Sequence, residues 1–177
     1  MKVGPYQYLT CIKCEAKLLA PAHWLSRGDE YQHYLTHEND ADDPNYQKFV
    51  SKLMDAVLPK LNPKAMGLDY GCGPSSALAK LLIQKDFNVK LYDPFFESND
   101  YNLSLKYDFI TCSETAEHFH RPAEEFRKLN SLLKPGGWLG IMTKFQTDNN
   151  RFANWSYRRD PTHVCLLYTS PSPRDLS

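Results

Sequence analysis

The chain has 177 residues, and its 21 basic and 21 acidic side chains give a formal net charge of zero. That balance argues against a nucleic-acid partner and against polybasic binding to a membrane surface, because both need a large positive excess. No apolar run approaches the roughly 20 residues of a membrane-spanning helix, and the amino terminus lacks a signal-peptide core. The sequence therefore predicts a cytoplasmic protein without a membrane span, and it leaves the oligomeric state open.

Residues 1–25 are predicted to be a loop or the remnant of a zinc ribbon. Cys11 and Cys14 have the spacing of one zinc knuckle, whereas a complete structural site needs four ligands. The odd total of five cysteines argues against a disulfide framework in a reducing compartment. Whether a Cys pair upstream of Met1 completes a zinc site stays open.

Helical and apolar segments alternate from residue 26 onward. Ser26 is expected to cap a short helix, and Asp43 is expected to cap a second helix that begins with Pro44. Short apolar runs then predict strands at 65–70, 89–92, 109–112 and 138–143. Strands that alternate with helices in this way predict an α/β fold with a mostly parallel sheet that is covered on both faces.

A turn with two glycines, Gly71 and Gly73, follows the first of these strands. Glycine lets a backbone pass close to a ligand, and the helix that follows directs N–H groups and a positive dipole end towards it. Asp69 precedes the turn, and Asp93 closes the next strand, where a carboxylate can accept ribose hydroxyl protons. Ser76 replaces the third glycine of the dinucleotide fingerprint, which argues against NAD as the ligand.

Four motifs stand in a fixed order along the chain. They are 68–73 (Leu-Asp-Tyr-Gly-Cys-Gly), Asp93, 107–110 (Tyr-Asp-Phe-Ile) and 133–137 (Leu-Lys-Pro-Gly-Gly). Together they resemble class I S-adenosylmethionine-dependent methyltransferases of the bacterial small-molecule type, over roughly residues 30–164. The resemblance implies a Rossmann-like sheet, S-adenosylmethionine as cofactor and methylation of a small-molecule acceptor. Oxygen is the predicted methylated atom, and nitrogen and carbon stay open as alternatives. The resemblance also implies a set of cofactor-binding residues: Asp69, Gly71, Gly73, Asp93, Ser113 and Glu114.

Two segments depart from the pattern of that family. About a dozen residues separate Asp93 from Tyr107, too few for a strand with its crossover helix, so the third strand is expected to be short or missing. The segment 165–175 resembles the translation of a transposase-type sequencing adapter. The prediction is therefore a methyltransferase domain over 26–164 that is a fragment, truncated before its carboxyl-terminal strands, followed by a non-native tail over 165–177.

Acidic and imidazole side chains gather directly after the strand at 109–112. Glu114, Glu117 and His118 are spaced i, i+3 and i+4, which places them on one face if the segment is a helical turn. This set suits Mg²⁺, Mn²⁺ or Zn²⁺, with His163 as a candidate fourth ligand. The spacing resembles the metal-binding Glu-x-x-Glu-His of ubiquinone-pathway O-methyltransferases and of small-RNA 2′-O-methyltransferases.

Two interpretations of this cluster stay open. In one, a divalent cation lowers the pKa of the acceptor hydroxyl, and Glu117 and His118 are catalytic. In the other no metal binds, the Glu-His pair shapes the cofactor pocket, and His118 acts as a base. Besides a small-molecule O-methyltransferase, the sequence admits a metal-dependent RNA 2′-O-methyltransferase and a non-catalytic S-adenosylmethionine-binding protein.

Overall fold

The computed structural model describes residues 1–37 and 40–168, and these divide into two compact units. The first unit consists of Met1–Thr36, Ala116–Pro122 and Thr143–Ser177, and the second of His37–Thr115 and Ala123–Met142. Each unit has its own buried apolar cluster. Within the described ranges no helix is both long enough and apolar enough to cross a membrane.

The second unit contains a parallel sheet, which has four strands in the part of the chain that the structure describes. They are β4 (Met66–Tyr70), β5 (Asn88–Tyr92), β6 (Tyr107–Ser113) and β7 (Leu133–Met142), in the order β5-β4-β6-β7. Asp69 of β4 lies opposite Leu91 of β5 on one side and Thr111 of β6 on the other. The predicted α/β fold with a parallel, Rossmann-like sheet is confirmed.

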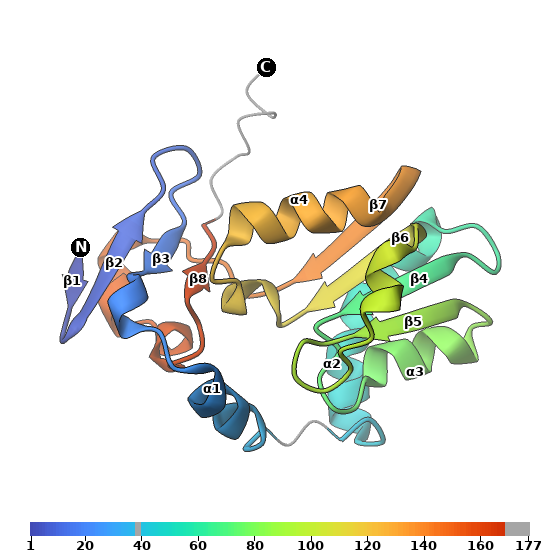
Figure 1. Ribbon diagram of the computed structural model, residues 1–177, viewed down its shortest axis with the longest axis horizontal. Coiled ribbons are helices and arrows are strands. Elements are labelled where there is room, and N and C mark those ends of the chain that lie inside the picture. Colours follow the sequence, from blue (N-terminus) through green and yellow to red (C-terminus); the bar gives the residue numbers. More distant parts are fainter. Residues whose placement is uncertain (38–39, 169–177) are drawn as a thin grey trace. The chain divides into compact units, whose positions relative to one another are not determined.

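Helices cover both faces of this sheet. They are α2 (Pro44–Val57), α3 (Ala77–Gln84) and α4 (Pro122–Leu132). Asp43 caps α2 as predicted, because its carboxylate accepts the N–H groups of Asn45 and Tyr46. Figure 1 shows α4 on the other side of the sheet from α2 and α3. The apolar faces of α2 and α3 pack together with Phe109 of β6: Val50, Leu53, Met54, Val57, Leu78 and Leu82.

The connection from β5 to β6 confirms the expectation of a short or missing third strand. Between these strands the described chain forms the 3-10 helix η3 (Asp100–Ser104) and one isolated antiparallel bridge, between Asp93 and Glu97. The side-chain amide of Asn102 donates to the carbonyl of Leu91 at 2.9 Å and so covers part of the β5 edge. A side chain thus occupies a backbone acceptor that a neighbouring strand would otherwise bind.

Strand β7 begins earlier than the sequence predicted. It starts at Leu133, directly after α4, and Leu133 pairs with Tyr107 while Trp138 pairs with Phe109. The extra residues on β7 form an irregularity that contains Gly136, whose φ is +78°. The strand was predicted at 138–143, but it also includes the Pro-Gly-Gly sequence, because an edge bulge tolerates proline and a left-handed glycine.

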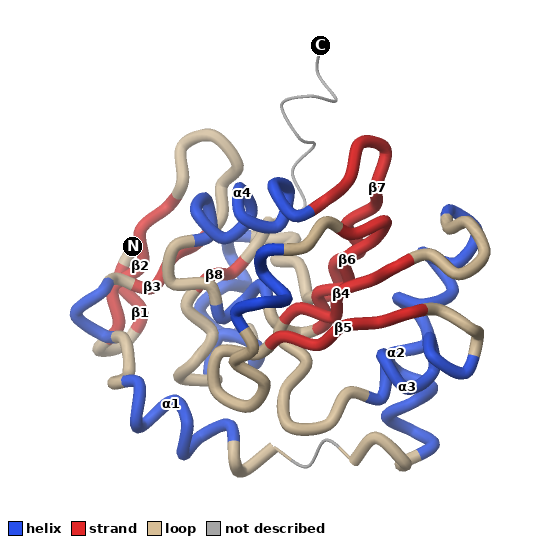
Figure 2. Tube along the Cα trace, turned by 45° about the vertical axis from the view of Figure 1, so that its right-hand side comes forward, coloured by secondary structure: helices blue, strands red, loops and turns tan. Residues whose placement is uncertain are grey.

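The first unit contains an antiparallel sheet, shown as strands in Figure 2. Its strands within the described ranges are β1 (Lys2–Val3), β2 (Tyr6–Thr10), β3 (Lys17–Leu19) and β8 (Cys165–Leu166), in that order. The predicted loop over 1–25 is therefore wrong. Tyr8 and Leu19 are buried against Phe152 and Tyr157, and contacts so distant along the chain are invisible to a local sequence pattern. The zinc-ribbon alternative stays a prediction.

Two further segments complete this unit. Helix α1 (Arg27–Tyr34) is capped as predicted by Ser26, whose hydroxyl accepts the N–H of Asp29. Strand β8 begins at Cys165, where the tail was predicted to start, and pairs with β3 through Leu18 and Cys165. The adapter origin of that tail stays a prediction, and its part beyond residue 168 lies outside the described residues.

Candidate functional site

The glycine turn leaves β4 at the carboxyl edge of the parallel sheet. Gly71 and Gly73 have φ angles of +78° and +62°, a region that side-chain-bearing residues rarely adopt. A Cβ on Gly71 would lie 2.1 Å from Thr115 Cγ2, so only glycine fits there. A Cβ on Gly73 would meet nothing within 4 Å, which leaves open space beside the backbone. The turn thus combines one tightly packed glycine with one that faces room for a ligand.

Asp69 lies beneath this turn and is almost fully buried. Its carboxylate accepts hydrogen bonds from Ser76 Oγ at 2.6 Å and from Thr111 Oγ1 at 2.7 Å. Ser76 also accepts the N–H of Ala79 at 2.9 Å and so caps α3. Burial raises the pKa of Asp69, while the bonds from Ser76 and Thr111 oppose that shift. Asp69 therefore ties the start of α3 to two strands and supports the turn from below.

Asp93 connects the end of β5 to the same turn. Its Oδ2 accepts the N–H of Gly73 at 3.0 Å, and its Oδ1 accepts the N–H groups of Phe95 and Phe96 at 2.8 and 3.1 Å. The structure thus brings together Gly71, Gly73 and Asp93, three of the predicted cofactor residues. The carboxylate is held in a fixed orientation and keeps acceptor capacity for a further donor.

The pKa of the Cys72 thiol reflects the negative charges around the turn. Burial raises the pKa of its thiol well above the usual range, and the charges of Asp69, Asp93 and Glu97 raise it further. The thiol is therefore neutral at physiological pH and is not a nucleophile. The same three carboxylates make the turn favourable for a cationic ligand.

Ser113 and Glu114, the other predicted cofactor residues, lie at the carboxyl end of β6. The N–H of Glu114 donates to Met142 O at 2.7 Å, and its φ is +47°. The predicted helical turn over 114–118 is therefore wrong. The backbone pairing with β7 continues through Glu114, and only η4 (Ala116–His118) is helical, as a single 3-10 turn.

The first unit gathers three of the predicted metal ligands. Ligand atoms of Glu117, His118 and His163 all lie within 4.8 Å of one another. Glu117 and His118 come from η4, and His163 follows η6 (Ser156–Arg159) along the chain. Glu117 is 1% exposed, so its carboxylate is removed from bulk solvent. Glu114 belongs to the second unit, and its role as a ligand stays a prediction.

Each residue of this cluster contacts a polar partner that is not itself a member of the cluster. His118 Nδ1 lies 3.1 Å from the carbonyl oxygen of Thr162, and His163 Nδ1 lies 2.6 Å from that of Tyr157. A carbonyl only accepts, so Nδ1 carries a proton in both rings. The Tyr157 hydroxyl donates to Glu117 Oε1 and lies 3.1 Å from Thr143 Oγ1. Such outer partners fix the orientation and tautomer of metal-binding side chains.

Sequence reasoning missed Tyr157 and Asp160, which support this cluster. Asp160 Oδ1 accepts the N–H of Thr162 at 2.9 Å, and His33 Nε2 lies 3.1 Å from the same oxygen. Burial opposes ionisation of Asp160, but the hydrogen bonds from Thr162, together with His163 and His33, lower its pKa to about 2. An Asp two residues before a Thr is an Asx-turn pattern, so Asp160 carried a sequence signal. Tyr157 carried none.

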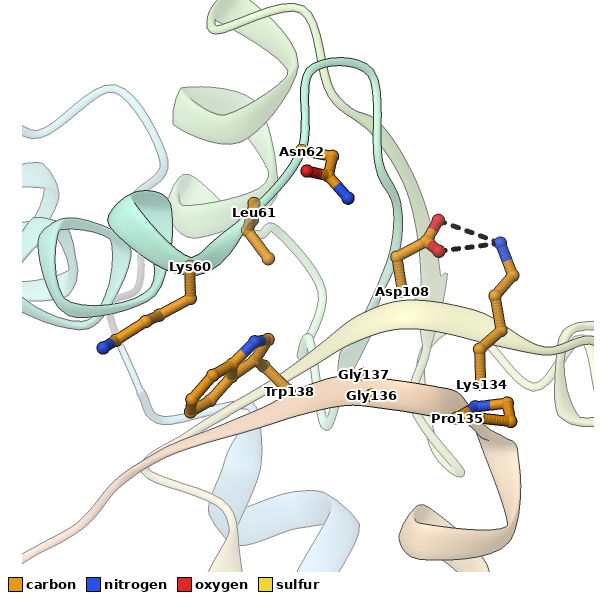
Figure 3. A pocket seen from close by; sticks show the side chains of 9 residues that line it. All are labelled: Lys60, Leu61, Asn62, Asp108, Lys134, Pro135, Gly136, Gly137 and Trp138. Atoms are coloured by element: carbon orange, nitrogen blue, oxygen red, sulfur yellow. Dashed lines mark hydrogen bonds and ion pairs between the residues drawn. The ribbon is translucent and has the colours of Figure 1, made fainter.

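A separate hollow lies at the opposite, amino-terminal edge of the parallel sheet (Figure 3). It has a volume of about 110 Å³. Lys60 Nζ lies 5.2 Å from the centre of the Trp138 ring, and Lys134 forms an ion pair with Asp108 at 2.9 Å. Sites for small organic ligands span roughly 300–1,000 Å³, so this hollow is too small for a nucleoside-sized cofactor.

A family model described as a methyltransferase domain matches residues 35–175. The chain belongs to the methyltransferase domain family. This membership, with the parallel sheet and its glycine turn, confirms the class I methyltransferase resemblance and its cofactor, S-adenosylmethionine. The divalent cation remains a prediction.

Curated relatives of this methyltransferase-family chain match it over short stretches. A ubiquinone biosynthesis O-methyltransferase of Serratia proteamaculans is 32% identical over 77 residues, which cover 44% of the chain and 32% of the relative. The enzyme of the same name from Paraburkholderia phytofirmans is 45% identical over 38 residues, 22% of the chain and 16% of the relative. The chain thus spans about a third or less of the length of these relatives. A solved O-methyltransferase family protein from Burkholderia thailandensis is 19% identical, with a TM-score of 0.42 over 73% of the chain and 52% of that protein.

Proposed function

We propose that this chain is the cofactor-binding part of an S-adenosylmethionine-dependent O-methyltransferase that acts on a small molecule with the help of a divalent cation. The observation that carries the proposal is the hydrogen bond from Gly73 to Asp93, which joins the glycine turn to the acid of the next strand. In open α/β sheets, ligands bind outside the carboxyl ends of the strands, where this pair lies. The matched O-methyltransferases support oxygen as the methylated atom.

The residues at the glycine turn fit S-adenosylmethionine in space and in charge. Open space beside Gly73 permits close approach, and Asp93 is fixed where it can accept ribose hydroxyl protons. The carboxylates around Cys72 favour the positively charged sulfonium. When bound, S-adenosylmethionine supplies an electrophilic methyl group. Asp69 would hold the turn in place, while Ser113 and Glu114 would line the cofactor side of β6.

The donor set of the first unit fits a divalent cation. Glu117, His118 and His163 offer one carboxylate and two imidazole nitrogens, the ligands of Mn²⁺, Zn²⁺ or Fe²⁺ sites with open positions. Their outer partners fix both imidazoles in the tautomer that metal binding needs. A cation held there would supply Lewis acidity and lower the pKa of an acceptor hydroxyl.

Methylation of a hydroxyl releases its proton, and this chain offers two acceptors for it. His118 presents Nε2 because Nδ1 donates to Thr162, so this nitrogen can take the proton when no metal occupies it. Glu117 is the second candidate base, and the Tyr157 hydroxyl stabilises its ionised form. The two interpretations of the cluster therefore differ in what His118 Nε2 binds.

Contacts in the basic segment 151–159 weigh against the RNA alternative. Arg158 donates to the carbonyls of Phe152 and Ala153, and Arg151 lies 3.5 Å from Asp148. Arg158 uses donors for backbone carbonyls and Arg151 is close to an acidic partner, so fewer donors of this segment are left for phosphates. A small-molecule acceptor needs no such charge.

The proposal is tested with purified chain by calorimetry and by methyl transfer to a panel of phenols and catechols. We expect Asp93→Asn to weaken S-adenosylmethionine binding about 10- to 100-fold, because it removes a charged acceptor. Asp100→Asn, at an exposed acid of η3, should bind like the unchanged chain. EDTA and Glu117→Gln should each abolish transfer while cofactor binding persists, and exposed Glu124→Gln should have no effect.

Each result has a contrary outcome. Unchanged cofactor affinity in Asp93→Asn would contradict the assignment of the site. Full activity in EDTA with loss of activity in His118→Ala would replace the cation with His118 as the base. Cofactor binding without transfer to any acceptor would favour a non-catalytic binding protein.

A further inference from the structure

The turn from Asp160 to His163 is organised by one carboxylate. Asp160 Oδ1 accepts the N–H of Thr162 at 2.9 Å and its hydroxyl at 2.5 Å. The N–H of His163 donates to the backbone carbonyl of Asp160 at 3.2 Å, which closes the turn. Thr162 is fully buried and His163 is 9% exposed, so little solvent competes for these bonds.

This turn sets the position of both imidazoles of the cluster. The carbonyl of Thr162, whose N–H and hydroxyl Asp160 holds, accepts the Nδ1 proton of His118. His163 lies at the end of the same turn, and its Nε2 is 3.9 Å from Asp160 Oδ2. The rings of His118 and His163 meet edge to face, with their centres 4.8 Å apart. A change in the turn would therefore move both rings.

Helix α1 fixes the same carboxylate from another direction. His33 Nε2 lies 3.1 Å from Asp160 Oδ1, and Tyr34 packs edge to face on His118 with ring centres 5.4 Å apart. Two successive residues of α1 thus contact the carboxylate and one of the imidazoles that depend on it. The cluster is supported by segments near residues 33, 118 and 160, all within the first unit.

We propose that Asp160 is a positioning residue, which through Thr162 holds His118 and His163 with both Nε2 atoms directed at one metal ion. This inference rests on the proposed function, because it assigns support to the candidate cation site. In this role Asp160 acts through Thr162 and is not one of the three ligands of that ion. Removal of its carboxylate frees the Thr162 carbonyl to rotate, so His118 loses the acceptor that holds its proton on Nδ1.

The test compares Asp160→Ala with Asp148→Ala in the full chain. Asp148 is a matched control, because it accepts the N–H of Asn150 at 2.8 Å in the same i to i+2 arrangement but pairs with Arg151. Zn²⁺ affinity is measured by competition with a chromophoric chelator. We expect Asp160→Ala to weaken Zn²⁺ binding about 10- to 100-fold, as loss of outer partners commonly does, and Asp148→Ala to leave it unchanged.

A second measurement needs no metal. Long-range ¹H–¹⁵N spectra of the metal-free protein report which imidazole nitrogen carries the proton. We expect the Nδ1–H tautomer at His118 and His163 in the unchanged chain and in Asp148→Ala, and a mixture in Asp160→Ala. Asp160→Asn keeps one acceptor oxygen but loses the charge, so it should show a smaller admixture of the other tautomer than Asp160→Ala and lose less than tenfold in affinity.

Wild-type affinity and tautomers in Asp160→Ala would overturn the inference, as would an equal loss of affinity in Asp148→Ala. If the unchanged chain binds no Zn²⁺, the metal part of the proposed function fails. The tautomer spectra then still decide whether Asp160 positions the imidazoles. If Asp160→Ala does not fold, a mixture of tautomers in Asp160→Asn supports the inference, and unchanged spectra with unchanged Zn²⁺ affinity overturn it.

Discussion

The glycine turn and the histidine–carboxylate cluster are held in place by different means. The turn depends on backbone conformation, because Gly71 and Gly73 occupy left-handed φ values and Gly71 packs against Thr115. The cluster depends on side-chain hydrogen bonds between segments about forty residues apart, such as Tyr157 to Glu117 and His118 to Thr162. The turn should therefore be sensitive to any added Cβ, and the cluster to the loss of single polar atoms.

The largest effect is expected when Gly71 is changed. Gly71→Ala adds a Cβ at a φ of +78° and 2.1 Å from Thr115 Cγ2. Left-handed strain costs about 1–2 kcal/mol and overpacking about 1–3 kcal/mol. We expect urea denaturation to show a loss of roughly 2–5 kcal/mol in the free energy of unfolding, together with loss of S-adenosylmethionine binding.

Gly136 provides the control for this change. It has the same φ of +78°, but a Cβ there would meet nothing within 4 Å. Gly136→Ala should cost only the strain, about 1–2 kcal/mol, and should leave cofactor binding intact. Equal losses in the two variants would mean that the close approach of Thr115 contributes nothing.

A smaller effect is expected in the cluster. Tyr157→Phe removes the hydroxyl that donates to Glu117 and contacts Thr143, and leaves a buried carboxylate short of one donor. Such a loss costs about 1–3 kcal/mol. Hydrogen exchange should reveal faster opening around 116–118 and 156–163 and unchanged protection in β4 and β5.

Tyr101 serves for comparison, because it is 68% exposed and lies outside the cluster. Tyr101→Phe should leave stability and exchange unchanged. If Tyr157→Phe also lowered protection in β4 and β5, the contrast between the two regions would be lost.

The smallest effect concerns pH. Hydrogen bonds from Lys134, and then from the N–H of Met66, lower the pKa of Asp108 below 3.8. A carboxyl with a depressed folded-state pKa contributes stability above its unfolded pKa, and that contribution is lost as pH falls through the folded value. Asp108→Asn should therefore destabilise the chain near neutral pH by under about 1 kcal/mol, since the pair is partly exposed.

Thermal unfolding at several pH values measures this difference. The difference in melting temperature between Asp108→Asn and the unchanged chain should shrink as pH falls below 3.8. Asp55→Asn, at an exposed acid of α2, should melt at the same temperature as the unchanged chain. A difference in melting temperature that grows on acidification would contradict the lowered pKa of Asp108.

Local signals predicted two helix starts and most of the second unit. Ser26 and Asp43 cap helices as expected, because an N-cap is a contact between residues two or three positions apart. The parallel strands were found within a few residues, except where β7 begins at Leu133. The strands at 1–25 were missed, because β2 and β3 depend on Phe152 and Tyr157 for their burial.

The candidate cluster was predicted only in part, for a related reason. Glu117, His118 and His163 were identified by residue type, and the structure brings them together. The helical turn that was meant to align Glu114 with them does not form, because Glu114 continues the backbone pairing with β7. The support from Tyr157 and Asp160 needs the fold, since a hydrogen bond across forty residues leaves no periodic pattern.

The sequence by itself determined the α/β class, the glycine turn with Asp93 and the methyltransferase family, because these depend on short spacings and on residue chemistry. Only the tertiary structure decided that Asp69 joins the start of α3 to two strands and that 1–25 contains strands. It also decided that Asp160 supports the imidazoles of the cluster and that Tyr157 donates to its carboxylate. The physical reason is the same throughout. Backbone preferences act over a few residues, whereas burial and side-chain hydrogen bonds join residues that only folding brings together.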